Sequence, residues 1–159
     1  MIIREILPQD NMSIKVIITD CFKEYDLPIA GSSLEDIDAN YMYQGFQQSR
    51  AVYYVVEEDG RILGGGGIKQ LLAASNHICE LQKMYFHPDA RNRGIGKKLL
   101  NLCMASAKKF NYKICYLESA SQLKPALKLY EKNGFEYLDS PQGKTGHSIC
   151  GIYMIKELI

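Results

Sequence analysis

Apolar residues recur along the chain with two different spacings, and each change of spacing marks the end of one predicted element. Apolar side chains two positions apart are typical of strands, and those three or four positions apart are typical of helices. The spacing predicts strands over residues 2–7, 51–57, 61–70, 76–86, 112–118, 135–138 and 149–158. It predicts helices over residues 10–23, 33–47, 94–110 and 123–132. The elements follow the order β-α-α-β-β-β-α-β-α-β-β, which indicates a mixed α/β (α+β) fold.

Turn and glycine residues refine this outline. Glu58-Asp59-Gly60 separates two strands in the manner of a hairpin turn. Four consecutive glycines, residues 64–67, lie inside a strand rather than before a helix, so they offer no helix N-terminus to a phosphate group. Glycines within a strand mark a bulge or the close approach of another backbone. We therefore expect a distorted strand at residues 64–67, and no cofactor site there.

Composition and charge limit the function classes that fit the chain. Its 159 residues are 47% hydrophobic and 23% charged, as in a single globular domain with a substantial core. The 19 basic and 18 acidic residues leave a net charge of +1, which favours neither nucleic acid nor an anionic membrane as a partner. The longest apolar run, residues 51–56, is far too short to cross a membrane. Charged residues at positions 4, 5 and 10 interrupt any signal-peptide pattern, so we expect a cytoplasmic protein.

The cysteines and histidines predict no metal site. The five cysteines are Cys21, Cys79, Cys103, Cys115 and Cys150. Their odd number and the lack of C-x-x-C spacing are typical of buried free thiols. His147, three residues before Cys150, leaves a nucleophilic pair as an alternative. His77 and His87 are isolated from other ligand residues, so we expect structural or solvent-exposed positions for them.

The segment Arg91-Asn92-Arg93-Gly94-Ile95-Gly96, between a predicted strand and a predicted helix, is the strongest candidate for a binding site. Its two glycines allow backbone N–H groups to approach an anion closely, and the helix N-terminus adds a partial positive charge. A diphosphate fits such a loop. A dinucleotide-binding fingerprint requires a third glycine where the chain has Leu99. A P-loop that ends at Gly143-Lys144-Thr145 requires its first glycine where the chain has Leu138.

The pattern Arg-x-x-Gly-x-Gly over residues 91–96 resembles the coenzyme A signature of the GNAT superfamily of N-acetyltransferases. A second segment, Leu129-Tyr130-Glu131-Lys132-Asn133-Gly134-Phe135, is similar to the L-Y-x-x-x-G-F motif of the same superfamily. The order of elements is also that of the GNAT fold, so the resemblance spans nearly the whole chain. It implies a mixed central sheet of about seven strands flanked by about four helices, in a single N-acetyltransferase domain over residues 1–159.

The resemblance also implies how a coenzyme would be held. Many GNAT members carry a bulge where the fourth strand separates from the fifth, and acetyl-CoA inserts there. The backbone N–H of Met84 would then face the thioester carbonyl as an oxyanion donor. Tyr130 would protonate the departing thiolate; core packing is the alternative role for this inward-facing side chain. The implied coenzyme-binding residues are Met84, Tyr85, Phe86, Arg91, Asn92, Arg93, Gly94, Ile95, Gly96, Lys97 and Tyr130.

Two carboxylates are candidates for the general base that removes a proton from the incoming amine. Glu80 precedes Arg91 by eleven positions, where the histone-modifying branch of the superfamily places its base. Glu118, at the end of the next strand, is the alternative.

One position departs from the family pattern. The family frequently has Asn seven residues before the tyrosine, in contact with the pantetheine arm, whereas this chain has Leu123. That contact is therefore absent, or it is replaced by a nearby polar residue. The candidate replacements are Ser119, Ser121 and Lys124.

The motifs do not specify the acceptor. In the GNAT fold, the acceptor site is shaped by two loops, which here span residues 25–32 and 139–148. Glu24, Asp26 and Glu35 are candidates to attract a cationic amine. A small amine, an amino-acid derivative, an antibiotic and a protein N-terminus or lysine all remain open.

Two functions follow from these features. The first is an N-acetyltransferase that moves an acetyl group from acetyl-CoA to an amine by direct attack in a ternary complex, without a metal. The alternative is a non-catalytic acyl-CoA-binding sensor or interaction module, which needs the loop but neither Tyr130 nor Glu80. The presence of both side chains favours the enzyme. The expected partners are acetyl-CoA and an amine acceptor, without nucleic acid or membrane, and a homodimer is left open.

Overall fold

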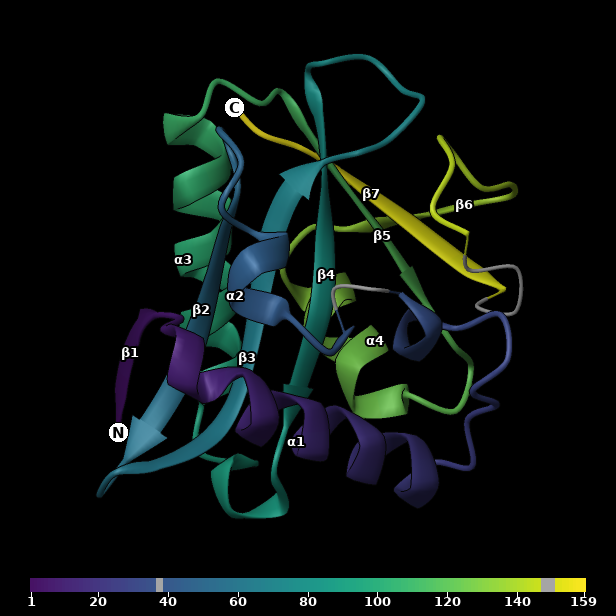
Figure 1. Cartoon of the computed structure of the whole chain (residues 1–159). Helices are drawn as coiled ribbons and strands as arrows, with labels where there is room; N and C mark the ends of the chain where they lie inside the picture. Colours follow the sequence, from purple (N-terminus) through teal and green to yellow (C-terminus); the bar gives the residue numbers. More distant parts are fainter. Residues whose placement is uncertain (37–38, 147–150) are drawn as a thin grey trace.

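A seven-stranded sheet lies at the centre of the computed structural model, which describes residues 1–36, 39–146 and 151–159 (Figure 1). The strands are β1 (Ile2–Glu5), β2 (Val52–Glu58), β3 (Arg61–Gln70), β4 (Ile78–Phe86), β5 (Ile114–Ser119), β6 (Glu136–Leu138) and β7 (Ile152–Glu157). The α-helices are α1 (Asn11–Glu24), α2 (Met42–Gly45), α3 (Ile95–Lys109) and α4 (Lys124–Lys132). The short 3-10 turns are η1 (Pro8–Asp10), η2 (Ser33–Glu35) and η4 (Pro88–Ala90). The predicted order of elements and the mixed sheet are confirmed.

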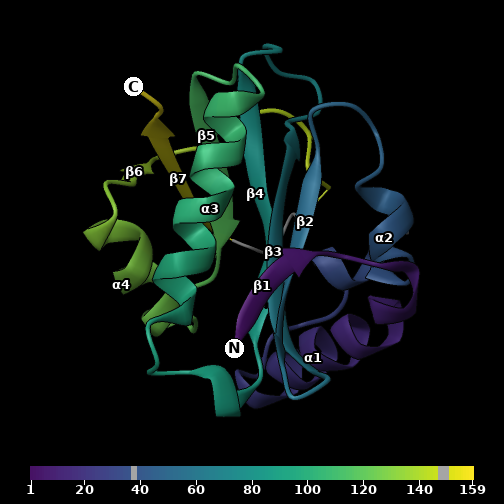
Figure 2. The ribbon, with the colours of Figure 1, turned by 90° about the vertical axis from the view of Figure 1, so that its left-hand side faces the viewer.

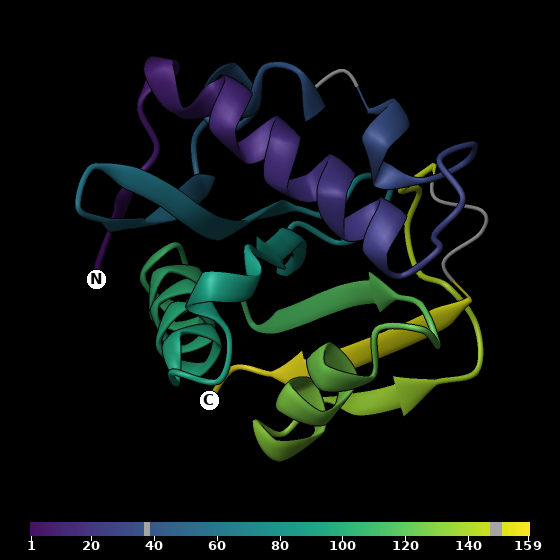
Figure 3. The same cartoon turned by 90° about the horizontal axis from the view of Figure 1, so that it is seen from below.

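The sheet separates two layers of helices. Its strand order is β1-β2-β3-β4-β5-β7-β6, and each neighbouring pair is antiparallel except β4 and β5. Figures 2 and 3 show α1 and α2 on one face and α3 and α4 on the other. Each face buries its own apolar core, with Ile14, Ile18 and Phe22 of α1 in one and Leu99 and Cys103 of α3 in the other. The amphipathic stripes found in the sequence therefore point at the sheet, as their spacing predicts.

The two parallel strands pair over only part of their length. Residues 78–80 of β4 pair with residues 114–116 of β5, and beyond Glu80 the two strands separate. Figure 3 shows β5 and β7, in green and yellow, diverging from the earlier strands. Because a sheet that opens in this way leaves no ladder partners along the inner edges, the gap between the strand ends is available to a ligand.

A bulge in β4 coincides with the glycine run of β3. The register between these strands shifts between Gly65 and Gly67, and Lys83 has a left-handed backbone with φ of 52°. A Cβ atom at Gly65 would lie 2.6 Å from the Tyr53 ring, and one at Gly67 would lie 2.7 Å from it. The bare backbone of β3 thus admits the buried Tyr53 ring, whose hydroxyl donates a hydrogen bond to Lys83 O at 2.7 Å. The predicted strand distortion is confirmed, and its physical cause is the close approach of Tyr53.

The helix predicted over residues 33–47 is wrong. The chain instead forms η2 and the single turn of α2, and residues 37–38 lie outside the described part. Tyr41, just before α2, has non-helical dihedral angles of −135° and 56°. The Asp36 carboxylate pairs with the Lys83 ammonium at 2.9 Å, while Met42 is fully buried against the sheet. Asp36 and Met42 thus make their tertiary contacts in two separate places. These contacts override the helical periodicity of the local sequence.

The remaining elements differ from prediction by a few residues at their ends, as is usual for helix and strand boundaries. The hairpin turn uses Asp59 and Gly60, both with positive φ, which suits the twist of the adjoining strands. Cys21, Cys79, Cys103 and Cys115 are buried free thiols, as predicted. The proposed pair of His147 and Cys150 falls outside the described residues. Within the described ranges, no helix has the length and apolar character that crossing a membrane requires.

Candidate active site

A cleft of about 540 Å³ occupies the gap between β4 and β5 and extends to the start of α3 and to α4. It is bordered by ten of the eleven residues for which coenzyme binding was predicted. These are Met84, Tyr85, Phe86, Arg91, Asn92, Gly94, Ile95, Gly96, Lys97 and Tyr130. Arg93 is not among the residues that line the cleft. Segments far apart in the sequence thus converge on one cavity.

The loop before α3 presents unpaired backbone N–H groups to the cleft. Asn92 and Gly94 have left-handed backbones, with φ of 58° and 74°, which turn the chain sharply into the helix. The first backbone bond at the start of α3 runs from Lys98 N to Gly94 O, so the N–H groups of residues 95–97 have no acceptor within the helix. At Gly96 a Cβ atom would lie 3.3 Å from Leu129 Cδ2, so a larger side chain would narrow the cleft. These features fit a diphosphate.

The arginine side chains of the loop are engaged elsewhere in the protein. The Arg91 guanidinium binds the Glu24 carboxylate through two hydrogen bonds, at 2.6 and 2.7 Å, and donates to Phe86 O at 2.8 Å. The hydrogen bond with Arg91 lowers the pKa of Glu24, and that with Glu24 raises the pKa of Arg91. Arg93 pairs in the same way with Glu58, at 2.7 and 2.9 Å. The side chains therefore brace the loop, and its backbone faces the cleft.

Tyr130 reaches the cleft from the buried face of α4. It is 6% exposed and packs against Phe135, with ring centroids 5.7 Å apart. Within the described residues, no group forms a hydrogen bond with its hydroxyl. Burial raises the pKa of Tyr130 above its ordinary value, so the hydroxyl stays protonated at neutral pH. A protonated hydroxyl with no acceptor among the described residues therefore borders the cleft.

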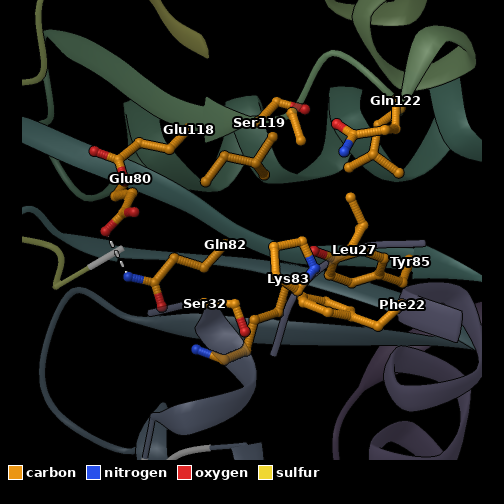
Figure 4. A pocket seen from close by; sticks show the side chains of 14 residues that line it. Phe22, Leu27, Ser32, Glu80, Gln82, Lys83, Tyr85, Glu118, Ser119 and Gln122 are labelled. Carbon is orange, nitrogen blue, oxygen red and sulfur yellow. Dashed lines mark hydrogen bonds between the residues drawn. The ribbon is translucent and has the colours of Figure 1, made fainter. Parts of the chain in front are cut away.

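A second, smaller cavity of about 120 Å³ adjoins the cleft on the side of α1 (Figure 4). Its polar lining includes Glu80, Gln82, Lys83 and Glu118, and its apolar lining comes partly from α1 and the segment that follows α1. Six residues line both cavities: Leu81, Lys83, Tyr85, Glu118, Ser119 and Leu123. The two cavities therefore meet where β4 and β5 separate. We refer to them as the large cleft and the small cavity.

The two candidate bases lie at this junction in different settings. Glu80 is 4% exposed, lines only the small cavity and accepts a hydrogen bond from Gln82 Nε2 at 2.6 Å. Glu118 lines both cavities and accepts from the Tyr116 hydroxyl at 2.6 Å and from Thr145 Oγ1 at 2.7 Å. Burial and the Glu118 carboxylate raise the pKa of Tyr116, which keeps its hydroxyl a donor. Both carboxylates are thus held in place by neighbouring donors.

Lys83 is the site residue that sequence reasoning missed. Its side chain is 1% exposed, and its ammonium lies 2.9 Å from the Asp36 carboxylate. In a regular strand it would point away from Gln82, yet the bulge brings both residues to the small cavity. A lysine in the interior of an otherwise central strand was the available signal.

The loops expected to shape the acceptor site contribute unequally. Leu27, Pro28 and Ser32 of the first loop line the small cavity, but Glu24, Asp26 and Glu35 do not. The second loop reaches the site through Thr145 and through Gln142 N, which donates to the Tyr116 hydroxyl at 3.1 Å.

Leu123 and Ser119, one of the candidate replacements, lie where the family pattern predicts a contact with the pantetheine arm. Leu123 and Ser119 line both cavities, whereas Ser121 and Lys124 line neither. Ser119 is therefore the replacement that the geometry permits. Among the described residues, no group of three or more His, Cys, Asp or Glu side chains is arranged to hold a metal ion.

Comparisons with known proteins agree with this geometry. Residues 14–135 match the profile of the acetyltransferase (GNAT) family. The chain is 41% identical over 158 residues to YjgM of Escherichia coli, an uncharacterised N-acetyltransferase, with 99% of this chain and 95% of the relative covered. The chain therefore belongs to the GNAT acetyltransferase family.

Solved structures show the same fold. A GNAT-family acetyltransferase from Staphylococcus aureus has a TM-score of 0.88 at 21% identity, with 99% of both chains covered. The PaiA N-acetyltransferase of Thermoplasma acidophilum, solved in complex with coenzyme A, has a TM-score of 0.70 at 20% identity, with 98% of both chains covered. At this level of identity the likeness concerns the fold, and the predicted GNAT fold is confirmed.

Proposed function

We propose that this protein binds acetyl-CoA in the large cleft and transfers its acetyl group directly to an amine in the small cavity. The observation that carries the proposal is the meeting of two cavities with different linings. The large cleft is lined by a backbone suited to an anion and by the protonated Tyr130, whereas the small cavity is lined by Glu80; Glu118 borders both. A ternary complex needs such an arrangement, because both substrates must reach one point from separate sides.

Binding rests on the backbone of residues 91–96, which offers N–H groups to the diphosphate of the coenzyme. The Arg91–Glu24 and Arg93–Glu58 pairs keep that backbone in place. The pantetheine arm lies along the unpaired edge of β4, over residues 84–86. This route places the thioester at the junction of the two cavities, near Met84 and Tyr130.

The transfer requires three proton movements and one change of bonds. The amine must lose one proton before or during attack, because an alkyl amine such as a lysine side chain has an ordinary pKa of about 10.4 and is charged at neutral pH. Glu80, directly or through a water molecule, accepts that proton and later passes it to solvent. The amine nitrogen forms a bond to the acetyl carbon as the carbon–sulfur bond breaks, and the Met84 N–H stabilises negative charge on the carbonyl oxygen. Tyr130 gives its proton to the departing sulfur, and the second proton of the nitrogen, released as the amide forms, returns to the Tyr130 oxygen through solvent.

A screen of amines tests the proposal. The protein is incubated with acetyl-CoA and a broad panel of small amines, amino acids and peptides, and released thiol is measured. Calorimetry with acetyl-CoA runs in parallel. We expect thiol release that depends on an amine. Tight coenzyme binding without release across the panel would contradict catalysis and favour the acyl-CoA-binding sensor.

A further inference from the structure

Two polar groups of the small cavity have no role in the proposed transfer. They are the side-chain oxygen of Gln82 and the ammonium of Lys83, which occupy consecutive positions on β4. Figure 4 shows both side chains at the cavity, together with Glu80 and Glu118. Buried polar groups normally find partners. Gln82 Oε1 has none among the described residues and the Lys83 ammonium has Asp36, so the oxygen and the remaining N–H donors of the ammonium indicate what else the cavity binds.

The orientation of the Gln82 amide is fixed by its neighbour. Nε2 lies 2.6 Å from Glu80 Oε2, and a carboxylate only accepts hydrogen bonds. The nitrogen must therefore face Glu80, and the oxygen must face away from it. Gln82 Oε1 is buried and has no hydrogen-bond partner among the described residues. The cavity thus holds an acceptor that requires an N–H or O–H donor from a ligand.

Lys83 supplies the opposite kind of group. An ammonium has three N–H donors, and the described residues provide one carboxylate, that of Asp36, at 2.9 Å. Its side chain is 1% exposed, so bulk water has little access to it. The cavity therefore combines a positively charged donor with one neutral and two carboxylate acceptors. A ligand that satisfies all of them carries both an amine and an anionic group.

Size and lining narrow the ligand further. The volume of about 120 Å³ limits the part of the ligand inside the small cavity to a small group, and the shared border with the large cleft gives the ligand further room. Phe22, Leu27 and Pro28 give part of the cavity an apolar wall. A small molecule with a short apolar side chain fills such a space, and the amine must point toward the junction, where the acetyl group is transferred.

We propose that the acceptor is a free amino acid with an apolar side chain. This inference rests on the proposed function. Its amino group donates to Gln82 Oε1 and lies near the two glutamates, its carboxylate binds the Lys83 ammonium, and its side chain packs on the apolar wall. The left-handed bulge at Lys83 is what brings the amide and the ammonium to one cavity.

Matched substrates test this without altering the protein. Acetylation of leucine is compared with that of leucinamide and of isopentylamine, which keep the side chain and the amine but lack the carboxylate. Methionine, valine and phenylalanine are assayed with their amides in the same way. We expect kcat/KM to be about 10- to 100-fold higher for the amino acids, as loss of a charged hydrogen bond predicts.

A pair of lysine variants assigns the preference to one side chain. Lys83→Met should raise KM for leucine about 10- to 100-fold and reduce the preference for leucine over leucinamide to near one. Lys69→Met is the matched control, because Lys69 is a half-buried lysine of β3 that lines neither cavity. Circular dichroism and acetyl-CoA calorimetry show whether each variant is folded. If Lys83→Met does not fold, the wild-type substrate comparison decides alone.

The outcomes separate this inference from the proposed function. Equal or better activity with amides and simple amines overturns the amino-acid assignment and leaves the acetyltransferase intact. Activity on peptides or larger amines with none on free amino acids has the same meaning. Acetyl-CoA binding without acetylation of any amine overturns both.

Discussion

The large cleft and the small cavity are built from different parts of the chain. Under the proposed function, the cleft contacts its ligand mainly with backbone: the N–H groups of residues 95–97 and the part of β4 beyond Glu80, which does not pair with β5. The small cavity faces its ligand with side chains, Glu80, Gln82, Lys83 and Glu118. A backbone site needs glycine and a particular turn, whereas a side-chain site tolerates many residue types. The contrast explains how one fold can keep its coenzyme while its acceptor varies.

The largest expected effect comes from Tyr130, the proposed proton donor of the large cleft. Tyr130→Phe removes one hydroxyl and should lower kcat by roughly 10²–10⁴-fold, the usual range for a positioned acid. Coenzyme affinity should change by no more than one hydrogen bond, about 1 kcal/mol, because the backbone binds the coenzyme. The measurements are kcat, calorimetric affinity and melting temperature. Tyr112→Phe, at a buried tyrosine that lines neither cavity, is the control. A stable Tyr130→Phe protein with wild-type kcat removes Tyr130 from the mechanism.

Substitutions at Glu80 and Glu118 test which of the two side chains is the general base. Glu80→Gln should lower kcat about 100-fold and move the acidic limb of the pH–rate profile to higher pH, since without the base only the neutral fraction of the amine reacts. Glu118→Gln should cost less than about tenfold, because its two oxygens already accept hydrogen bonds from hydroxyl groups. Steady-state rates between pH 5 and pH 9, roughly the interval between the ordinary pKa values of carboxylates and alkyl amines, provide the measurement. The reverse ranking assigns the base to Glu118.

Two glycines form a matched pair that tests the backbone character of the cleft. Gly94 and Gly60 have φ of 74° and 77°, and neither has an atom within 4 Å of a Cβ position. Valine at either position costs about 1–3 kcal/mol of backbone strain. Gly94→Val should therefore weaken acetyl-CoA binding by roughly 5- to 150-fold, because the loop relaxes away from its binding shape. Gly60→Val should lower stability alone. Equal coenzyme affinity in the two variants would contradict binding at the loop.

The smallest effect is expected at the Arg91–Glu24 ion pair, which supports the loop before α3. Glu24→Gln should lower the free energy of unfolding by less than about 1 kcal/mol at pH 7, because the pair is partly exposed. Coenzyme affinity should change by less than about threefold by the same reasoning. Arg91 lowers the pKa of Glu24 in the folded state, so the pair stabilises the protein above the unfolded-state pKa and loses that effect as pH falls through the folded-state pKa.

Urea unfolding of wild type and Glu24→Gln at pH 7 and at pH 3 measures this dependence. The difference between the two proteins should be full at pH 7 and smaller at pH 3, because Glu24 becomes protonated as pH falls toward and through its lowered folded-state pKa. An undiminished difference at pH 3 would mean that the Arg91 contact acts through packing rather than charge.

The sequence predicted the cleft better than the small cavity, and the reason is physical. Gly94 and Gly96 before a helix specify a local backbone shape, and local shape is visible in local sequence. Lys83 and Asp36 meet because β4 bulges at Lys83 and because the segment after α1 passes close by. No spacing pattern in the sequence predicts either the bulge or the course of that segment. The same long-range contact explains why the helix prediction over residues 33–47 is wrong, because Asp36 pairs with Lys83 of β4. Tyr130 was predictable since its helical spacing fixed its burial.

The contact between Tyr53 and the glycine run limits which residues can change when the acceptor preference is redesigned, or when it changes in evolution. The contact joins three groups: the Tyr53 ring, the glycine backbone beneath the ring, and the Lys83 carbonyl that accepts a hydrogen bond from the Tyr53 hydroxyl. All three must change together for the contact to change. Any single replacement at Gly65 or Gly67 collides with the ring before it can reshape the pocket. Libraries aimed at new acceptors should therefore hold β2 and β3 constant and vary Gln82, Leu27 and Ser32, whose side chains face the cavity without supporting the bulge.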